Sequence, residues 1–121
     1  GSSAWFERGF VTYSNEAKSQ MIGVSEATLL SHGAVSEPVV VEMAIGALRA
    51  ARADYAISVS GIAGPDGGSA EKPVGLVWFA WIGPGVAHSE SCIFSGDRAA
   101  VRVQTVQHSL ERLLDLIEEQ A

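Results

Sequence analysis

The sequence is short of cysteine, of basic residues and of long hydrophobic runs, and each shortage removes a class of protein. Its single cysteine, Cys92, can form neither an intrachain disulfide nor a multi-cysteine zinc site, so we expect a reducing, cytoplasmic setting. Eight lysines and arginines against 14 aspartates and glutamates give a net charge of −6, which argues against general binding to nucleic acids or membrane surfaces. The apolar runs fall far short of the ~20 residues of a bilayer span, and we expect no leader peptide.

What is present suits one folded domain. The chain has 121 residues, 47% of them hydrophobic, which is enough for a single core. Apolar periodicity and capping residues predict strands within 4–13, 54–60, 74–82 and 88–94, and helices over 15–22, 26–32, 37–51 and from Asp97 onward. The strand at 54–60 is apolar enough to be covered on both faces, so we expect an α/β domain over residues 1–121 with helices on both sides of the sheet. In the last helix, Val106, Leu110, Leu113 and Ile117 are the apolar positions expected to face the sheet.

A glycine-rich loop, GIAGPDGG at 61–68, follows the buried strand and Ser60. Its glycines let backbone amides approach a ligand, and such loops at the carboxyl ends of strands often bind one. It is not a P-loop, because no Gly-Lys-Ser/Thr follows, and the glycine spacing does not match a dinucleotide fingerprint. A long hairpin-like connection with ordinary turn chemistry explains the segment equally well.

A second candidate is Tyr13 with Lys18, in the segment YSNEAK. A lysine can act as a base when burial lowers its pKa, and a nearby tyrosine can relay a proton or hold a substrate oxygen. From these residues alone, an exposed Lys18 on a short helix and a Tyr13 packed on the sheet are the better reading.

A third candidate is Arg98, which follows Asp97 in the segment SGDR. A cation is unfavourable in the first turn of a helix, whereas a guanidinium beside free backbone amides makes a good carboxylate or phosphate site. An Asp97 cap beside a solvated Arg98 is the equal alternative.

The remaining reactive residues do not suggest a metal site. His32, His88 and His108 have no metal-ligand spacing, so we expect no metal. No basic residue lies close to Cys92 in sequence, so we interpret it as a packed residue and not as a nucleophile.

Four segments taken together resemble the CinA C-terminal domain family over essentially the whole chain: GSSAWFERGFVTYSNEAK, HGAVSEPVVVEMA, SGIAGPDGG followed by EKPVG, and FSGDRAAVR. The resemblance implies a three-layer α/β/α sandwich with a mixed sheet. It also implies hydrolysis of the carboxamide of nicotinamide mononucleotide to nicotinic acid mononucleotide and ammonia, in pyridine nucleotide recycling. We therefore expect a small nucleotide as substrate, no cofactor and a homodimer.

The same resemblance assigns roles to individual residues. Lys18 is the expected general base of a serine and lysine pair, and Tyr13 is its hydroxyl partner. The expected substrate-binding positions are Ser60, Gly61, Ile62, Ala63, Gly64, Arg98 and, in the opening GSS segment, Ser3.

One family motif is missing. The family carries a Glu-Ser-Cys-Thr-Gly-Gly segment on a further strand and helix, and its serine is the expected nucleophile; no such segment occurs here. Ser91 and Cys92 continue into Ile93 and do not take that role. We expect the domain to be incomplete at its N-terminus, with the nucleophile upstream. A non-catalytic nucleotide-binding module, or an interaction module using a sheet edge and Trp5, is the alternative.

Overall fold

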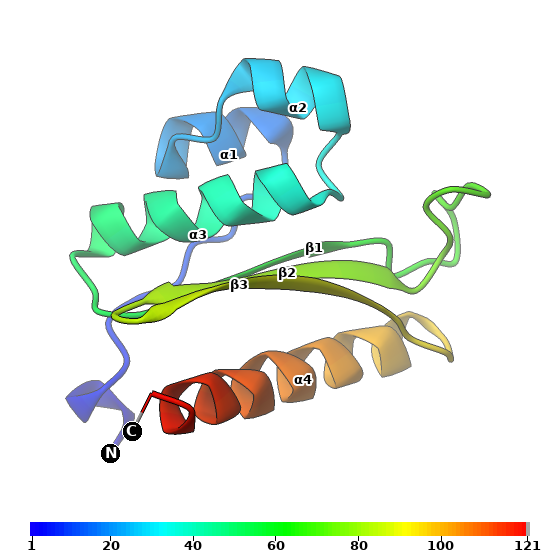
Figure 1. The fold of residues 1–121 in the computed structure, drawn as a ribbon. Helices are drawn as coiled ribbons and strands as arrows, with labels where there is room; N and C mark the ends of the chain where they lie inside the picture. The colour runs from blue at the N-terminus through cyan, green and yellow to red at the C-terminus, as the bar shows by residue number, and fades with distance from the viewer. Residues whose placement is uncertain (121) are drawn as a thin grey trace.

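A computed structural model describes residues 1–120 of the chain. Three helices come first, then three strands and a last helix, close to where the sequence predicts them, and Figure 1 shows their arrangement. In chain order the elements are a 3₁₀ turn η1 (Ser2–Ala4), α1 (Asn15–Ile22), α2 (Glu26–His32), α3 (Glu37–Ala51), β1 (Ala56–Gly61), β2 (Leu76–Gly83), β3 (Val86–Ile93) and α4 (Arg98–Glu118). Among residues 1–120, no helix has both the length and the apolar composition that a membrane span needs.

The sheet has the order β1-β2-β3, and both strand pairs are antiparallel. Consecutive strands joined without a crossover helix pair in this way, whereas a parallel pair needs a long crossover connection. The mixed sheet therefore is not seen in residues 1–120 and stays a prediction. The outer edge of β1 has no partner strand in the part of the chain described.

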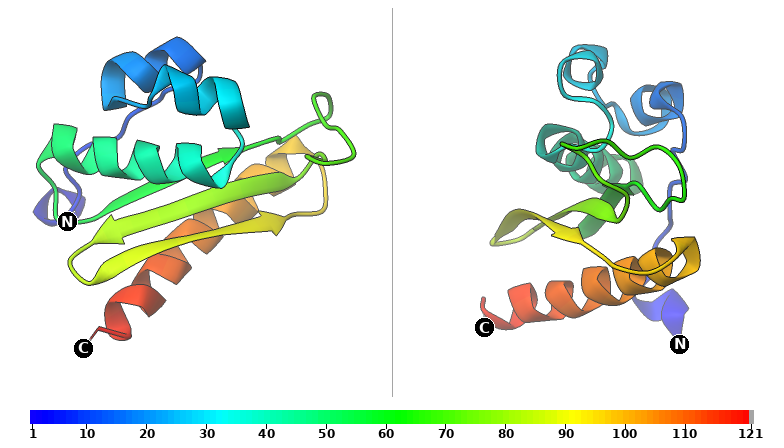
Figure 2. Two further views of the ribbon diagram at one scale, coloured as in Figure 1. Left: turned by 45° about the horizontal axis from the view of Figure 1, so that its top comes forward. Right: turned by 90° about the vertical axis from the view of Figure 1, so that its right-hand side faces the viewer.

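Helices lie on both faces of this sheet. Figures 1 and 2 show α3 against one face with α1 and α2 stacked beyond it, and α4 across the other face. Alternation along each strand divides the side chains between two cores. The α3 side holds Val39, Val40 and Ala80, and the α4 side holds Phe79, Trp81 and Val101, all nearly inaccessible to solvent.

The strand expected within residues 4–13 is wrong for this structure. After η1 the chain runs without regular structure to the cap of α1, and it pairs with none of the strands described. Aromatic and β-branched residues favour a strand only where a neighbouring strand completes the hydrogen bonds. Without one, Trp5 is 72% exposed and Tyr13 90% exposed.

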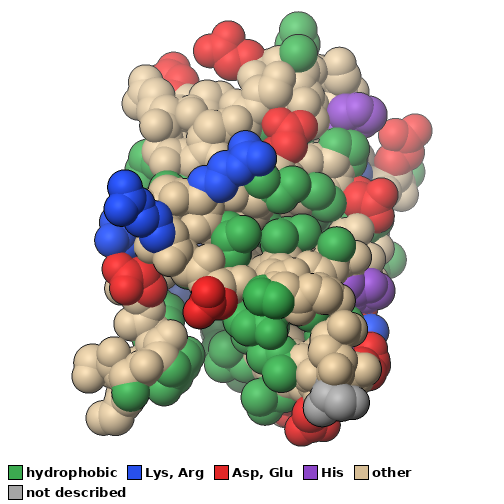
Figure 3. All heavy atoms as spheres, turned by 60° about the vertical axis from the view of Figure 1, so that its left-hand side comes forward, with side chains coloured by type: hydrophobic (Ala, Val, Ile, Leu, Met, Phe, Trp, Pro, Cys, Tyr) green, Lys and Arg blue, Asp and Glu red, His purple; other side chains and the backbone are tan. Residues whose placement is uncertain are grey.

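The face of α4 that meets the sheet agrees with the expectation only in part. Leu113 packs against the core on this side and Ile117 is half-buried, as expected. Val101 and Leu116 are buried, whereas Val106 and Leu110, which were expected to face the core, are 59% and 48% exposed. With Val103 and Leu114 they form a second apolar stripe that no described element covers. Figure 3 shows hydrophobic side chains gathered on the molecular surface beside the C-terminal end of α4. When a helix has two apolar stripes, both show the helical spacing of apolar residues. That spacing alone therefore does not predict which stripe is buried.

Candidate active site

Lys18 is a buried cation, contrary to the exposed alternative. Ser14 begins α1 by accepting a hydrogen bond from the Ala17 amide at 3.0 Å, which fixes the first turn. Lys18 lies in the next turn and is only 5% exposed. Its ammonium turns back and donates to the carbonyl of Thr12 at 2.7 Å and to that of Tyr13 at 3.2 Å. The chain entering the helix therefore forms the wall against which the lysine packs.

No carboxylate compensates this charge. Lys18 forms no ion pair in residues 1–120, and its partners are the two backbone carbonyls. Burial disfavours the charged ammonium, so the pKa of Lys18 is lowered from the ordinary 10.5. A lowered pKa makes the neutral amine, which is the form that accepts a proton, easier to reach near neutral pH.

Tyr13 and Ser3 do not meet Lys18 through their side chains. The phenol of Tyr13 is 90% exposed, and the contact with Lys18 is made by the Tyr13 carbonyl. Ser3 lies in η1, which has no buried residue. Their roles as hydroxyl partner and pocket residue stay predictions.

The glycine loop leaves the C-terminal end of β1 in a conformation that requires glycine at position 64. Gly64 has a positive φ of 83°, and a Cβ there would approach the Cγ1 of Val74 to 2.5 Å. Any L side chain would therefore be strained and would also clash. Glycine with positive φ is also ordinary turn chemistry, and the loop joins the antiparallel strands β1 and β2. The hairpin-like connection given above as the alternative is therefore present, whether or not the loop also binds a ligand.

Only part of the loop backbone is free to bind a ligand. The Ile62 amide donates to the Leu76 carbonyl at 2.9 Å, so it is already used. The amides of Ala63 and Gly64 have no hydrogen-bond acceptor in residues 1–120. Two neighbouring unpaired amides are suited to an oxyanion or another negatively charged group.

The structure brings Arg98 to this loop. The Arg98 guanidinium donates to the Gly64 carbonyl at 3.0 Å, across 34 residues of sequence. Asp97 still caps α4 by accepting from the Ala100 amide at 2.9 Å, so the cap and the loop contact coexist. An open hollow of about 470 Å³ lies here, lined among others by Ala63, Val74 and Arg98. A larger hollow of about 660 Å³ between α1 and α3 contains none of the candidate residues.

The candidate residues thus fall into two groups. Ser60 shares its strand face with Ser58, whose hydroxyl donates to the Val40 carbonyl of α3, so Ser60 lies on the same side of the sheet as α1 and Lys18. Arg98 and the loop form the other group, at the end of the strands. The right-hand view in Figure 2 looks at this end of the molecule, with α1 above the loop and the start of α4 below it. No hydrogen bond joins the two groups within residues 1–120.

A third group of reactive residues was missed in sequence. Glu90 accepts hydrogen bonds from His88 and His108, each at 2.7 Å, and from Arg112 at 3.2 Å. Burial raises the pKa of Glu90, but these hydrogen bonds outweigh it and the pKa is lowered. The sequence pattern could have indicated this group. Residues 88, 90 and 92 alternate along one face of a strand, and residues 108 and 112 lie one turn apart on a helix.

Sequence comparisons point to one family. The family model for the CinA C-terminal domain matches residues 1–117. The nicotinamide-nucleotide amidohydrolase PncC of Escherichia coli (strain K12) is 72% identical over 116 residues, which cover 93% of this chain and 69% of that protein. The protein of the same name from Pseudomonas putida is 54% identical, over 96% of this chain and 72% of its own length.

Solved structures agree with the sequence comparisons. The competence/damage inducible protein CihA from Agrobacterium tumefaciens superimposes with a TM-score of 0.92 at 47% identity, over 96% of this chain and 72% of that one. Sequence and fold similarity extend together over nearly all of the chain.

Proposed function

This chain belongs to the CinA C-terminal domain family, and on that premise we propose that it forms the greater part of a nicotinamide-nucleotide amidohydrolase. The reaction is hydrolysis of the carboxamide of nicotinamide mononucleotide to nicotinic acid mononucleotide and ammonia. The first support is the relative from Escherichia coli, which carries that activity in its name at 72% identity.

Buried, uncompensated Lys18 is the observation that carries the proposal. A cation held only by backbone carbonyls is costly to the fold, and its lowered pKa suits a general base. Most lysines keep the ammonium in water or pair it with a carboxylate. Lys18 is 5% exposed and forms no ion pair within the described residues.

In the proposed mechanism, the neutral amine of Lys18 takes the proton of a serine hydroxyl while the serine oxygen attacks the carboxamide carbon. The tetrahedral intermediate collapses as the Lys18 ammonium gives that proton to the leaving nitrogen, and ammonia departs. Lys18 then takes a proton from water, whose oxygen attacks the acyl-serine. Release of nicotinic acid mononucleotide returns the serine proton and closes the cycle.

The loop supplies binding in this scheme. The unpaired amides of Ala63 and Gly64 are the proposed donors to the oxyanion or to a substrate oxygen. Arg98 holds the loop through Gly64 and presents its remaining N–H groups to the negatively charged part of the nucleotide. Ser60, on β1 directly before the loop, is the proposed hydroxyl contact to the substrate on the Lys18 side of the sheet. Tyr13 offers an exposed phenol for a substrate oxygen.

We propose further that a preceding strand and helix supply the nucleophilic serine. The chain spans 69% of the Escherichia coli relative, the outer edge of β1 is unpaired in residues 1–120, and the apolar stripe of α4 is uncovered. A parallel strand beside β1 would complete the mixed sheet of a three-layer sandwich, and its helix would cover Val59 and the stripe. We also propose that the protein is cytoplasmic and forms a homodimer. Light scattering on the chain joined to such a preceding segment tests the dimer.

The decisive experiment measures ammonia release from nicotinamide mononucleotide. The chain is assayed alone and joined behind the N-terminal part of the Escherichia coli relative, with nicotinamide riboside as control substrate. We expect turnover in the joined protein, and less activity toward the riboside if Arg98 reads the phosphate. A folded joined protein that binds the mononucleotide without releasing ammonia would contradict the amidohydrolase and favour a binding module.

A matched pair of variants tests the loop. In the joined protein, Arg98→Ala removes the contact with Gly64 and should raise KM for the mononucleotide at least about tenfold, because one charge-assisted hydrogen bond is worth roughly that factor. Arg102→Ala, one turn further along α4 and exposed, should leave KM unchanged. Equal effects of the two substitutions would remove the role of Arg98.

A further inference from the structure

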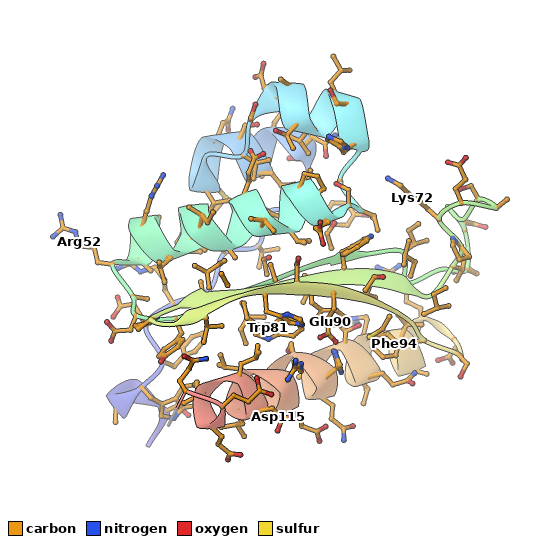
Figure 4. The ribbon with its side chains drawn as sticks, in the orientation of Figure 1. Arg52, Lys72, Trp81, Glu90, Phe94 and Asp115 are labelled. Atoms are coloured by element: carbon orange, nitrogen blue, oxygen red, sulfur yellow. The ribbon has the colours of Figure 1, made fainter. Side chains whose placement is uncertain are left out.

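Between β3 and α4, three side chains of different chemistry converge away from the proposed active site. A Glu90 oxygen, the Cys92 sulfur and a His108 ring nitrogen all lie within 4.8 Å of one another. Glu90 and Cys92 are two residues apart on β3 and so share a face, and His108 comes from α4 opposite. Figure 4 shows Glu90 pointing from the sheet into the layer above α4, beside Trp81 and Phe94.

We propose that Glu90, Cys92 and His108 bind one Zn²⁺ ion. The Cys92 sulfur lies 3.6 Å from His108 Nε2. Zinc bonds of about 2.3 Å to sulfur and about 2.0 Å to nitrogen at a tetrahedral angle put these two atoms about 3.5 Å apart. The Glu90 oxygen Oε2 is 2.7 Å from the same nitrogen and needs to withdraw by less than about 1 Å to become the third ligand.

The chemistry of the three donors selects a zinc-like ion. A thiolate and an imidazole favour borderline-soft metals over Mg²⁺ and Ca²⁺, which prefer oxygen ligands alone. Three protein ligands leave the fourth tetrahedral position to water.

The other Glu90 oxygen is held by outer partners. His88 lies 2.7 Å and Arg112 Nε 3.2 Å from Oε1, so Oε2 is left for the metal. Partners of this kind fix the orientation of a ligating carboxylate. Arg112 also offsets part of the negative charge of the thiolate and the carboxylate.

Aromatic packing fixes the imidazole rings before any metal arrives. His108 packs edge-on against Phe79, with ring centroids 4.8 Å apart, and against Trp81 and Phe94 at 6.0 and 6.2 Å. His88 stacks on Trp81 at 5.7 Å. Ligands that are already placed lose little conformational freedom on binding, which favours affinity.

Binding at this site also releases a proton. The metal binds the Cys92 thiolate, so coordination sends the thiol proton to solvent.

The test is a Co²⁺ titration of the metal-free chain, followed by displacement with Zn²⁺. Because Cys92 is the only cysteine, thiolate-to-cobalt charge-transfer absorption can come only from this site. We expect one ion per chain, loss of the absorption in Cys92→Ala, and at least about tenfold weaker binding in His108→Gln. His32→Gln, which changes an exposed histidine at the end of α2, should bind as the unaltered chain does.

Three results would overturn the site: no saturable binding, which leaves the cluster as ion pairs only; cobalt binding without charge-transfer absorption; or half an ion per chain, which indicates bridging between copies. If His108→Gln does not fold, the unaltered chain still decides. Zn²⁺ must then slow alkylation of Cys92 at least about tenfold, and an unchanged alkylation rate would overturn the proposal.

Discussion

Lys18 and Glu90 are both charged groups removed from water, but their surroundings differ. Lys18 is 5% exposed, and within residues 1–120 its partners are the carbonyls of Thr12 and Tyr13 alone. The Glu90 side chain is 28% exposed and is met by His88, His108 and Arg112. A partnered charge can contribute to stability, whereas an unpartnered one is maintained at a cost. This difference supports our proposals that Lys18 acts in catalysis, and that Glu90 holds α4 against the sheet and is placed to bind a metal ion.

The largest expected effect of breaking this contrast is on activity. In the joined protein, Lys18→Met keeps the length and packing of the side chain but removes the base. Turnover of nicotinamide mononucleotide should fall by about 10²–10⁴-fold, the usual contribution of a positioned general base. Ammonia release is the measurement. Lys72→Met is the matched control, since Lys72 also donates to a backbone carbonyl, that of His32 at 2.7 Å. Retention of most activity in Lys18→Met would end the assignment of Lys18.

The converse substitution should affect stability and spare activity. In chelator-treated protein, Glu90→Gln leaves His108 and Arg112 without their shared carboxylate and should cost about 1–2 kcal/mol in the free energy of unfolding. Partial exposure of Glu90 keeps the value at the lower end of the range for charged hydrogen bonds. Urea unfolding measures it, with Glu119→Gln, an exposed partner of Arg112, as control. If Glu90→Gln instead lowers turnover, the division between the two regions is wrong.

The two regions were also unequally predictable from sequence. The helix over 15–22 depends on local signals, and the structure has it as α1. Burial of Lys18 is not local, because it depends on the chain folding back so that the carbonyls of Thr12 and Tyr13 face the ammonium. The contact of Arg98 with Gly64 likewise joins residues 34 positions apart.

The sequence analysis missed the Glu90 cluster and misplaced part of the buried face of α4 for the same reason. Both depend on which stripe of α4 faces β3, and the helix offers two apolar stripes. If Val106 and Leu110 faced the core, His108 would lie on the opposite side of the helix, away from Glu90. The observed choice, with Val101 and Leu116 buried, turns it inward. The rotation of α4 on the sheet is set by long-range packing. For this reason the sequence alone predicted neither the proposed metal ligands nor the uncovered stripe.

A smaller effect is expected at acidic pH, where Glu90 titrates and Lys18 does not. The pKa of Glu90 is lowered below its ordinary 4.5 in the folded protein, so folding favours its charged form. Its contribution to stability is therefore present above pH 4.5 and is lost as the pH falls through the folded pKa. Urea unfolding of metal-free protein at a series of acidic pH values should show the gap between the unaltered chain and Glu90→Gln closing. A gap that stays constant would mean that the glutamate is not the titrating group.

The smallest expected effect lies on the alkaline side and concerns Lys18. Its pKa is also lowered, from 10.5, so the folded protein releases this proton before the unfolded chain does. The unfolded state binds more protons between the folded pKa and 10.5, and stability should rise with pH across that window. Cys92 acts in the opposite direction there, because its pKa is raised above 9.0 and the unfolded thiol ionises first. Cys92 lies in another element and contributes equally to the unaltered chain and to Lys18→Met. Its contribution therefore cancels in the difference between their unfolding free energies, and the contribution of Lys18 is left. That difference should increase with pH; a flat or falling difference would mean that burial does not disfavour the Lys18 ammonium, and the contrast with Glu90 would lose its physical basis.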